Sequence, residues 1–182
     1  MLNKFELIGI GASVIAMAVG LFLLRVNTSF FNLTDSKTQL ASLVGGVVVV
    51  NGDSGSDATT ALKNALLDSV GPTGILEKLV INDVVFGTGE AVKSGDSVTV
   101  NYIGTLQDGQ EFDNSFKRGT PFTFTVGAGK VIKGWEEGLL GMKVGGKRIL
   151  VVPAEMGYGA KGYGPIPGGA SLVFAIDLVV IK

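Results

Sequence analysis

The chain has 182 residues, a mass of 18.8 kDa and a net charge of −1, with 15 Lys and Arg against 16 Asp and Glu. It contains neither Cys nor His, which excludes disulfide bonds, thiolate or imidazole metal sites, and every catalytic scheme that needs either side chain. A pI near 5.4 argues against nucleic-acid binding, which usually needs a basic surface. We therefore expect no metal, no cofactor and no nucleic-acid partner. With 17% charged residues and a mean hydropathy of +0.45, an apolar excess must be concentrated somewhere in the chain.

That excess lies at the N-terminus. Leu7 to Leu24 (LIGIGASVIAMAVGLFLL) is a run of eighteen uncharged residues, about 27 Å long as a helix and apolar on all sides. It predicts an uncleaved transmembrane anchor over residues 1–26. The alternative is a cleavable signal peptide, whose apolar region is usually shorter and ends in a small-x-small site. Lys4 before the span and only Arg25 close after it favour a single-pass protein whose C-terminal part is extracytoplasmic.

Residues 27–75 have a mixed composition in which Ser, Thr, Asn and Asp are frequent. A short apolar patch covers 47–50, and the sequence NGDSGSD at 51–57 is typical of a flexible turn. Asp57 can cap a short helix that ends near Gly71-Pro72. We interpret the segment as a linker, with a short helix in it, that holds a domain off the membrane; a small packed subdomain is the alternative.

The pattern changes at about residue 76. Segments with the period of half-buried strands, or short apolar runs bounded by turn residues, recur four times, at 98–103, 122–126, 149–152 and 172–178. Asp108-Gly109, between two strand-like stretches, indicates a hairpin turn. Residues 76–182 are therefore predicted to form a domain built mainly of β-strands.

One helix is predicted within this domain, from Val131 to Leu140. Val131, Trp135 and Leu139 fall on one face of it, and Glu136 lies off that face. Strands surround this single helix without β-α-β alternation. The fold class is therefore α+β, an antiparallel sheet with one short helix against its face, preceded by the membrane anchor and the linker.

Aromatic residues are dense in the domain. Nine of them lie between residues 102 and 174, namely Tyr102, Phe112, Phe116, Phe122, Phe124, Trp135, Tyr158, Tyr163 and Phe174. A Phe-rich core explains part of this density, and for Phe124 it is the favoured interpretation. Tyr158 and Tyr163, however, lie in a Gly-rich loop (GYGAKGYGPIPGG). Aromatic residues in such a loop favour an apolar pocket with a polar hydroxyl at its lip.

Taken together, six sequence blocks resemble the FKBP-type peptidyl-prolyl cis-trans isomerases over residues 76–182. The blocks are VNYIGTLQDG at 100–109, EFDNS at 111–115, PFTF at 121–124, VIKGWEEG at 131–138, GYGA at 157–160, and Ile166-Pro167 followed by LVF at 172–174. Each block alone is weak, but their order makes the resemblance specific. The loop departs from the family at Tyr163, where many members carry His.

The resemblance implies a sheet wrapped across one helix, with the active pocket between them. Trp135 is expected at the floor of this pocket, the Tyr158 hydroxyl at its rim, and the backbone N–H of Ile132 on a ligand carbonyl. The implied catalytic residues are Tyr102, Phe112, Asp113, Trp135, Tyr158 and Phe174. The implied substrate-binding residues are Arg118, Phe122, Val131, Ile132 and Ile166.

The implied activity is rotation about X-Pro peptide bonds, which makes and breaks no bond and needs no acid, base or metal. Two interpretations of Asp113 stay open: it acts on the twisting amide itself, or it pairs with Arg118 and orients the pocket wall. The implied partners are proline-containing polypeptides and macrolide-type inhibitors, and residues 7–24 are expected to contact a lipid bilayer. The alternatives are a membrane-tethered proline-peptide-binding or chaperone module with little catalysis, and a structural protein that docks to a partner complex.

Overall fold

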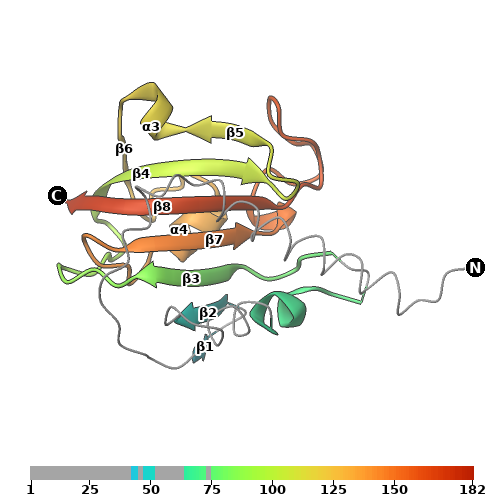
Figure 1. The fold of residues 1–182 in the computed structure, drawn as a ribbon, viewed down its shortest axis with the longest axis horizontal. Helices are drawn as coiled ribbons and strands as arrows, with labels where there is room; N and C mark the ends of the chain where they lie inside the picture. The colour runs from blue at the N-terminus through green and yellow to red at the C-terminus, as the bar shows by residue number, and fades with distance from the viewer. Residues whose placement is uncertain (1–41, 45–46, 52–63, 73–74) are drawn as a thin grey trace, which may run out of the picture.

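The computed structural model describes residues 42–44, 47–51, 64–72 and 75–182 (Figure 1). Within these ranges, no helix is long and apolar enough to cross a membrane. The predicted anchor at 7–24 lies outside the described residues, as does most of the predicted turn at 51–57. Of the short helix predicted in the linker, residues 64–69 are helical; Ala65 and Leu66 are buried, whereas Leu67 is exposed.

In the described part of the chain, eight strands form one sheet in the order β1-β2-β3-β7-β8-β4-β5, with β6 paired to β4 (Figure 1). The strands are β1 Ser42–Val44, β2 Val47–Asn51, β3 Val80–Val85, β4 Ser97–Leu106, β5 Glu111–Asn114, β6 Phe122–Thr125, β7 Lys147–Val152 and β8 Leu172–Ile181. Besides the helical residues 64–69, the helical elements are α3 Ser115–Arg118, α4 Lys133–Gly138 and the 3₁₀ turn η1 Ala154–Met156. All four predicted strand segments are strands, and from β3 onward the pairing is antiparallel, as expected.

The first two strands come from the segment interpreted as a linker. β1 and β2 form an antiparallel pair, and β2 then adds to the sheet parallel to β3, with Val48 opposite Val80. A parallel junction needs a long crossover connection, and the chain between β2 and β3, which includes the helical residues 64–69, supplies it. The sheet therefore begins before residue 76, and one of its pairs is parallel, which the sequence had not indicated.

The two longest strands, β4 and β8, are neighbours in the sheet and pair along nearly their whole length. On β4, Val98, Val100 and Tyr102 are buried and the residues between them are half-buried, as the alternation predicted. β4 then turns through Asp108-Gly109 into β5, where Gly109 has a φ of +86°. The predicted hairpin is thus confirmed, and it places β5 beside the C-terminal end of β4.

The helix α4 is shorter than the predicted 131–140. Ile132 is its N-cap, with φ −62° and ψ 150°, so the backbone just before Lys133 is extended. The helix lies directly against β7: a Cβ built on Gly134 would be 2.5 Å from Cγ1 of Val152. Real Cβ atoms do not come this close to other heavy atoms, so glycine is required for this approach. The helix carries Trp135 into the space between it and the sheet.

Candidate active site

Trp135 is the centre of a cluster of aromatic rings. Its ring centroid lies 4.9 Å from that of Tyr102, 5.2 Å from Phe174, 5.8 Å from Phe124 and 6.2 Å from Phe122. The contacts with Tyr102 and Phe174 are nearly perpendicular, an arrangement that aromatic pairs favour. Trp135 is only 4% exposed, and its indole Nε1 has no hydrogen-bond partner in the described part of the chain. We call this cluster of five rings the aromatic floor.

Two further aromatic contacts extend the aromatic floor toward solvent. Phe112 meets Phe174 at 5.6 Å and 87°. Phe122 stacks on Phe124 at 5.4 Å and remains 37% exposed, whereas Phe124 is buried. The core interpretation of Phe124 therefore agrees with its burial. Phe122 keeps part of its side chain accessible, so the aromatic floor has an apolar edge that an apolar ligand can contact from solvent.

Val131 and Ile132 precede α4 and pack against the same core. The Ile132 carbonyl accepts a 2.9 Å hydrogen bond from the Trp135 N–H and so begins the helix. The Ile132 N–H lies outside the helix, because its own residue is extended, and none of the described residues accepts a hydrogen bond from it. The chain thus presents an unpaired backbone donor beside the aromatic floor.

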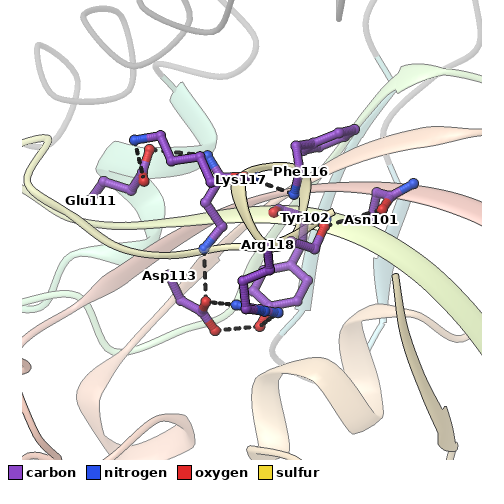
Figure 2. A network of polar contacts seen from close by, with 9 residues as sticks. Asn101, Tyr102, Glu111, Asp113, Phe116, Lys117 and Arg118 are labelled. Atoms are coloured by element: carbon purple, nitrogen blue, oxygen red, sulfur yellow. Dashed lines mark hydrogen bonds and ion pairs between the residues drawn. The ribbon is translucent and has the colours of Figure 1, made fainter. Parts of the chain in front are cut away.

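A polar network joins Tyr102, Asp113 and Arg118 next to the aromatic floor (Figure 2). The Tyr102 hydroxyl donates to Oδ2 of Asp113, and Arg118 Nη1 donates to Oδ1 of the same carboxylate. Arg118 Nη2 also donates to the Tyr102 hydroxyl oxygen at 3.0 Å, with its guanidinium carbon 5.4 Å from the Tyr102 ring centroid. Both carboxylate oxygens of Asp113 are therefore occupied within the protein.

Asn114 and Ser115, which hold this network in place, were not singled out from the sequence. Asn114 Oδ1 accepts hydrogen bonds from two N–H groups in α3, at 2.9 and 3.2 Å, and so caps that short helix. The buried Ser115 hydroxyl accepts a 2.8 Å bond from the Tyr102 backbone N–H. Together they fix α3, which ends in Arg118, against β4. An Asn before a helical turn is a common N-cap and was the available signal.

The Gly-rich loop after η1 carries two stacked phenols. The rings of Tyr158 and Tyr163 lie 5.3 Å apart at 15°. Tyr163 is 69% exposed, while Tyr158 packs against the core. Two backbone hydrogen bonds of 2.9 Å between Tyr163 and Ile166 close the loop into a tight turn, and Ile166 is buried. Burial, and then the neighbouring Tyr163, raise the pKa of the Tyr158 hydroxyl above its ordinary value, so this phenol remains a donor at neutral pH.

All eleven residues predicted for the site belong to the hydrophobic core of the domain, which contains Trp135, pack against that core, or contact Tyr102 directly. Among the described residues, no group of three or more acidic side chains is arranged to hold a metal ion. The arrangement offers a buried aromatic surface, the unpaired N–H of Ile132 beside it and an ordered polar wall. It offers no nucleophile with an adjacent base.

Comparison with known proteins identifies a family that matches this chain. Residues 88–179, about half of the chain, match the family model described as FKBP-type peptidyl-prolyl cis-trans isomerase. FK506-binding protein 2 of Emericella nidulans is 60% identical over 89 residues, which cover 48% of this chain and 66% of the relative. An FK506-binding protein of Neisseria meningitidis is 49% identical over 104 residues, 57% of this chain and 95% of the relative. The crystal structure of FkpA from Escherichia coli matches with a TM-score of 0.55 at 50% identity, over 58% of this chain and 48% of that one.

The coverage of these matches differs between relatives. The chain spans just under two thirds of the Emericella nidulans protein but nearly all of the Neisseria meningitidis protein. The family match contains Trp135, the polar network and the loop with Tyr158. A relative matched at 49% identity over 95% of its own length shows that this domain is common to both proteins. The chain belongs to the family of FKBP-type peptidyl-prolyl cis-trans isomerases.

Proposed function

We propose that this chain accelerates cis-trans rotation of X-Pro peptide bonds in folding polypeptides. The observation that carries the proposal is the aromatic floor around the buried Trp135, with the unpaired Ile132 N–H beside it. A dry aromatic surface fits the ring of a proline, and an unpaired donor fits the carbonyl of a neighbouring residue. Membership of the isomerase family supports the same activity.

The mechanism follows from the chemistry of the amide. An X-Pro bond rotates over a barrier of about 18–20 kcal/mol because twisting destroys the amide resonance, and uncatalysed rotation takes tens of seconds or more. The twisted amide has lost the charge separation of the planar form, so an apolar pocket favours it over the ground state. With the proline over Trp135, the Ile132 N–H and the Tyr158 hydroxyl anchor the flanking carbonyls and keep the peptide turned. No bond is made or broken.

For Asp113 we propose the orienting role. Both of its carboxylate oxygens already accept hydrogen bonds, one from Tyr102 and one from Arg118. A substrate carbonyl therefore faces a hydrogen-bonded carboxylate rather than a free one. In this role Asp113 holds the Tyr102 ring, and with it one side of the aromatic floor, in a fixed orientation.

The activity is tested by proline-limited refolding of a substrate protein in the presence of the full chain, kept in mild detergent because of residues 7–24. We expect the slow refolding phase to accelerate in proportion to the amount of chain added. A well-folded chain that binds proline-containing peptides without accelerating the phase would instead establish the binding-module alternative. We propose that the same aromatic floor also binds macrolide-type inhibitors. The two relatives are named FK506-binding proteins. FK506 is therefore expected to abolish the acceleration.

The pH dependence of the activity is expected to be nearly flat. The sequence has no His or Cys to titrate near neutrality, and the pKa of Tyr158 is raised, so its hydroxyl stays protonated below its ordinary pKa of about 10 and is lost as a donor only above it. We expect kcat/KM to vary less than about twofold between about pH 6.5 and about pH 9. A bell-shaped profile within that range, measured with constant substrate, would contradict a mechanism without proton transfer.

We propose further that residues 7–24 anchor the chain in a bilayer and that the domain acts on the extracytoplasmic side. The support is the uncharged eighteen-residue run and the charges that flank it. The full chain is expected to float with liposomes in a density gradient. Replacing Ile15 and Val19 by Arg should abolish flotation, because each charge at the centre of a span costs about 2.5–3.5 kcal/mol, whereas Ile15→Leu should float. Wild-type chain that stays at the bottom of the gradient would contradict the anchor.

A further inference from the structure

A buried arginine connects the sheet to the helix that carries Trp135. Arg148 on β7 is 6% exposed and pairs with Asp83 on β3, which is 8% exposed. Two hydrogen bonds join them, Nε to Oδ1 at 2.6 Å and Nη2 to Oδ2 at 2.9 Å. Such a two-point pair fixes the plane of the guanidinium as well as its position.

The remaining nitrogen of Arg148 reaches the end of α4. Nη1 donates to the carbonyl oxygens of Gly138 at 2.7 Å and of Leu140 at 3.1 Å. Gly138 is the last residue of α4, and carbonyls at a helix C-terminus have no partner within the helix. α4 has six residues, and a helix of that length is not stable alone. Its position therefore depends on contacts such as this one.

We propose that Arg148, oriented by Asp83, is a positioning residue for the isomerase pocket: it holds α4, and so Trp135, at a fixed distance from the sheet. The proposal rests on the proposed isomerase function. A cavity of about 200 Å³ borders the pair and is lined also by Met142 and Lys143, from the turn that follows α4. The turn that follows α4 therefore borders open space into which it can shift when the bonds from Arg148 are removed.

Stability alone is a poor account of this pair. Burying two charges carries a desolvation penalty that their attraction often only offsets, so apolar residues of similar volume frequently serve stability equally well. What arginine adds is geometry, because its planar fork donates to a carboxylate and to a helix end at once. Lysine keeps the positive charge opposite Asp83, but its single ammonium cannot span the same partners in the same plane.

The test compares two Asp→Asn variants and one Arg→Lys variant of the full chain. Arg148→Lys keeps the charge opposite Asp83 and removes the planar fork, and Asp83→Asn removes the carboxylate that orients it. Asp177→Asn is the matched control, because Asp177 on β8 pairs with the adjacent β7 residue, Lys147, at 2.7 Å. Trp135 is the only tryptophan of the chain, so its emission spectrum reports directly on the aromatic floor.

For Arg148→Lys we expect kcat/KM, corrected for the folded fraction, to fall about tenfold, since small misplacements of binding groups have effects of this order. The Trp135 emission is expected to shift to the red as the indole gains solvent. Asp83→Asn should shift both in the same direction to a smaller extent, and Asp177→Asn should leave both unchanged. These results together would support the positioning role.

Native emission and native kcat/KM in folded Arg148→Lys would overturn the proposal, even if its melting temperature fell, because the pair would then act on stability alone. If Arg148→Lys does not fold, Asp83→Asn decides in the same way. A red shift in Asp177→Asn as large as that in Arg148→Lys would also overturn the proposal, since losing any ion pair on β7 would then displace Trp135. If the unaltered chain shows no isomerase activity, the proposed function fails, but the emission comparison still shows whether Arg148 places Trp135.

Discussion

Asp113→Leu and Arg118→Met are each expected to lower kcat/KM about 10- to 100-fold, and the double variant is expected to lose little more. Each change breaks the same wall: Asp113 accepts hydrogen bonds from Tyr102 and Arg118, and Arg118 also bonds the Tyr102 hydroxyl. Residues that share one network show such non-additive effects. The side chains of Asp113 and Arg118 are 38% and 45% exposed, so the expected loss of stability is only about 1 kcal/mol or less.

The measurement is a double-mutant cycle on kcat/KM, with thermal unfolding to confirm that each variant is folded. Lys117→Gln is the control, because Lys117 lies on the same short helix as Arg118 but pairs with Glu111 of β5, at 2.7 Å, rather than with Asp113. It should change neither activity nor stability appreciably. Full activity in Arg118→Met alongside a large loss in Asp113→Leu would instead favour direct action of the carboxylate on the twisting amide.

Gly134→Ala is expected to destabilise the domain by about 1–3 kcal/mol, the usual cost of overpacking, and to lower kcat/KM roughly tenfold. Helix propensity acts in the opposite direction, since alanine is favoured over glycine within helices by about 1 kcal/mol. The steric contact outweighs this preference and makes the net change in stability unfavourable. The new Cβ would lie 2.5 Å from Cγ1 and 2.8 Å from Cγ2 of Val152, which is a stiff and fully buried side chain. The helix must move away from β7, and Trp135 moves with it.

Val152→Ala supplies the control for this prediction, because it removes the two nearest of the three Val152 atoms that the new Cβ would meet. Alone it leaves a cavity and destabilises the domain. Combined with Gly134→Ala it should be less harmful than the sum of the two single changes. Urea unfolding measures the stabilities, and refolding catalysis measures the activity. A stabilised Gly134→Ala variant with native activity would show that α4 does not depend on this close contact.

Much of the domain could be predicted because its signals are local. On β4, the alternation of Val98, Val100 and Tyr102 with polar neighbours reports directly which residues are buried. The site residues came from motif blocks whose order the fold preserves. The ends of α4 were wrong because Val131 and Leu139 share the apolar character of Trp135 while lying outside the helix, and periodicity cannot distinguish a helical residue from a flanking one that packs in the same direction.

Other features depend on partners far apart in the chain. Asp83 and Arg148 are separated by 65 positions, and neither stands in a motif or spacing that indicates the other. The apolar patch at 47–50 was visible, but its parallel pairing with β3 is determined by where the crossover returns, which no short pattern encodes. The free N–H of Ile132 follows from one extended residue before α4, a detail of backbone geometry that composition does not report.

The position of β8 between β7 and β4 has a consequence for how the protein is made. β4 and β7 do not pair with each other; both pair with β8, which follows every other described strand in the chain. During synthesis, the two neighbours emerge from the ribosome with one edge each unpaired, and the wall that carries Phe174 is still missing. Non-local pairing of this kind is slow, and open strand edges invite aggregation. The surface proposed to bind substrate is thus incomplete until β8 has been synthesised, and until then the open edges of β4 and β7 are exposed to aggregation.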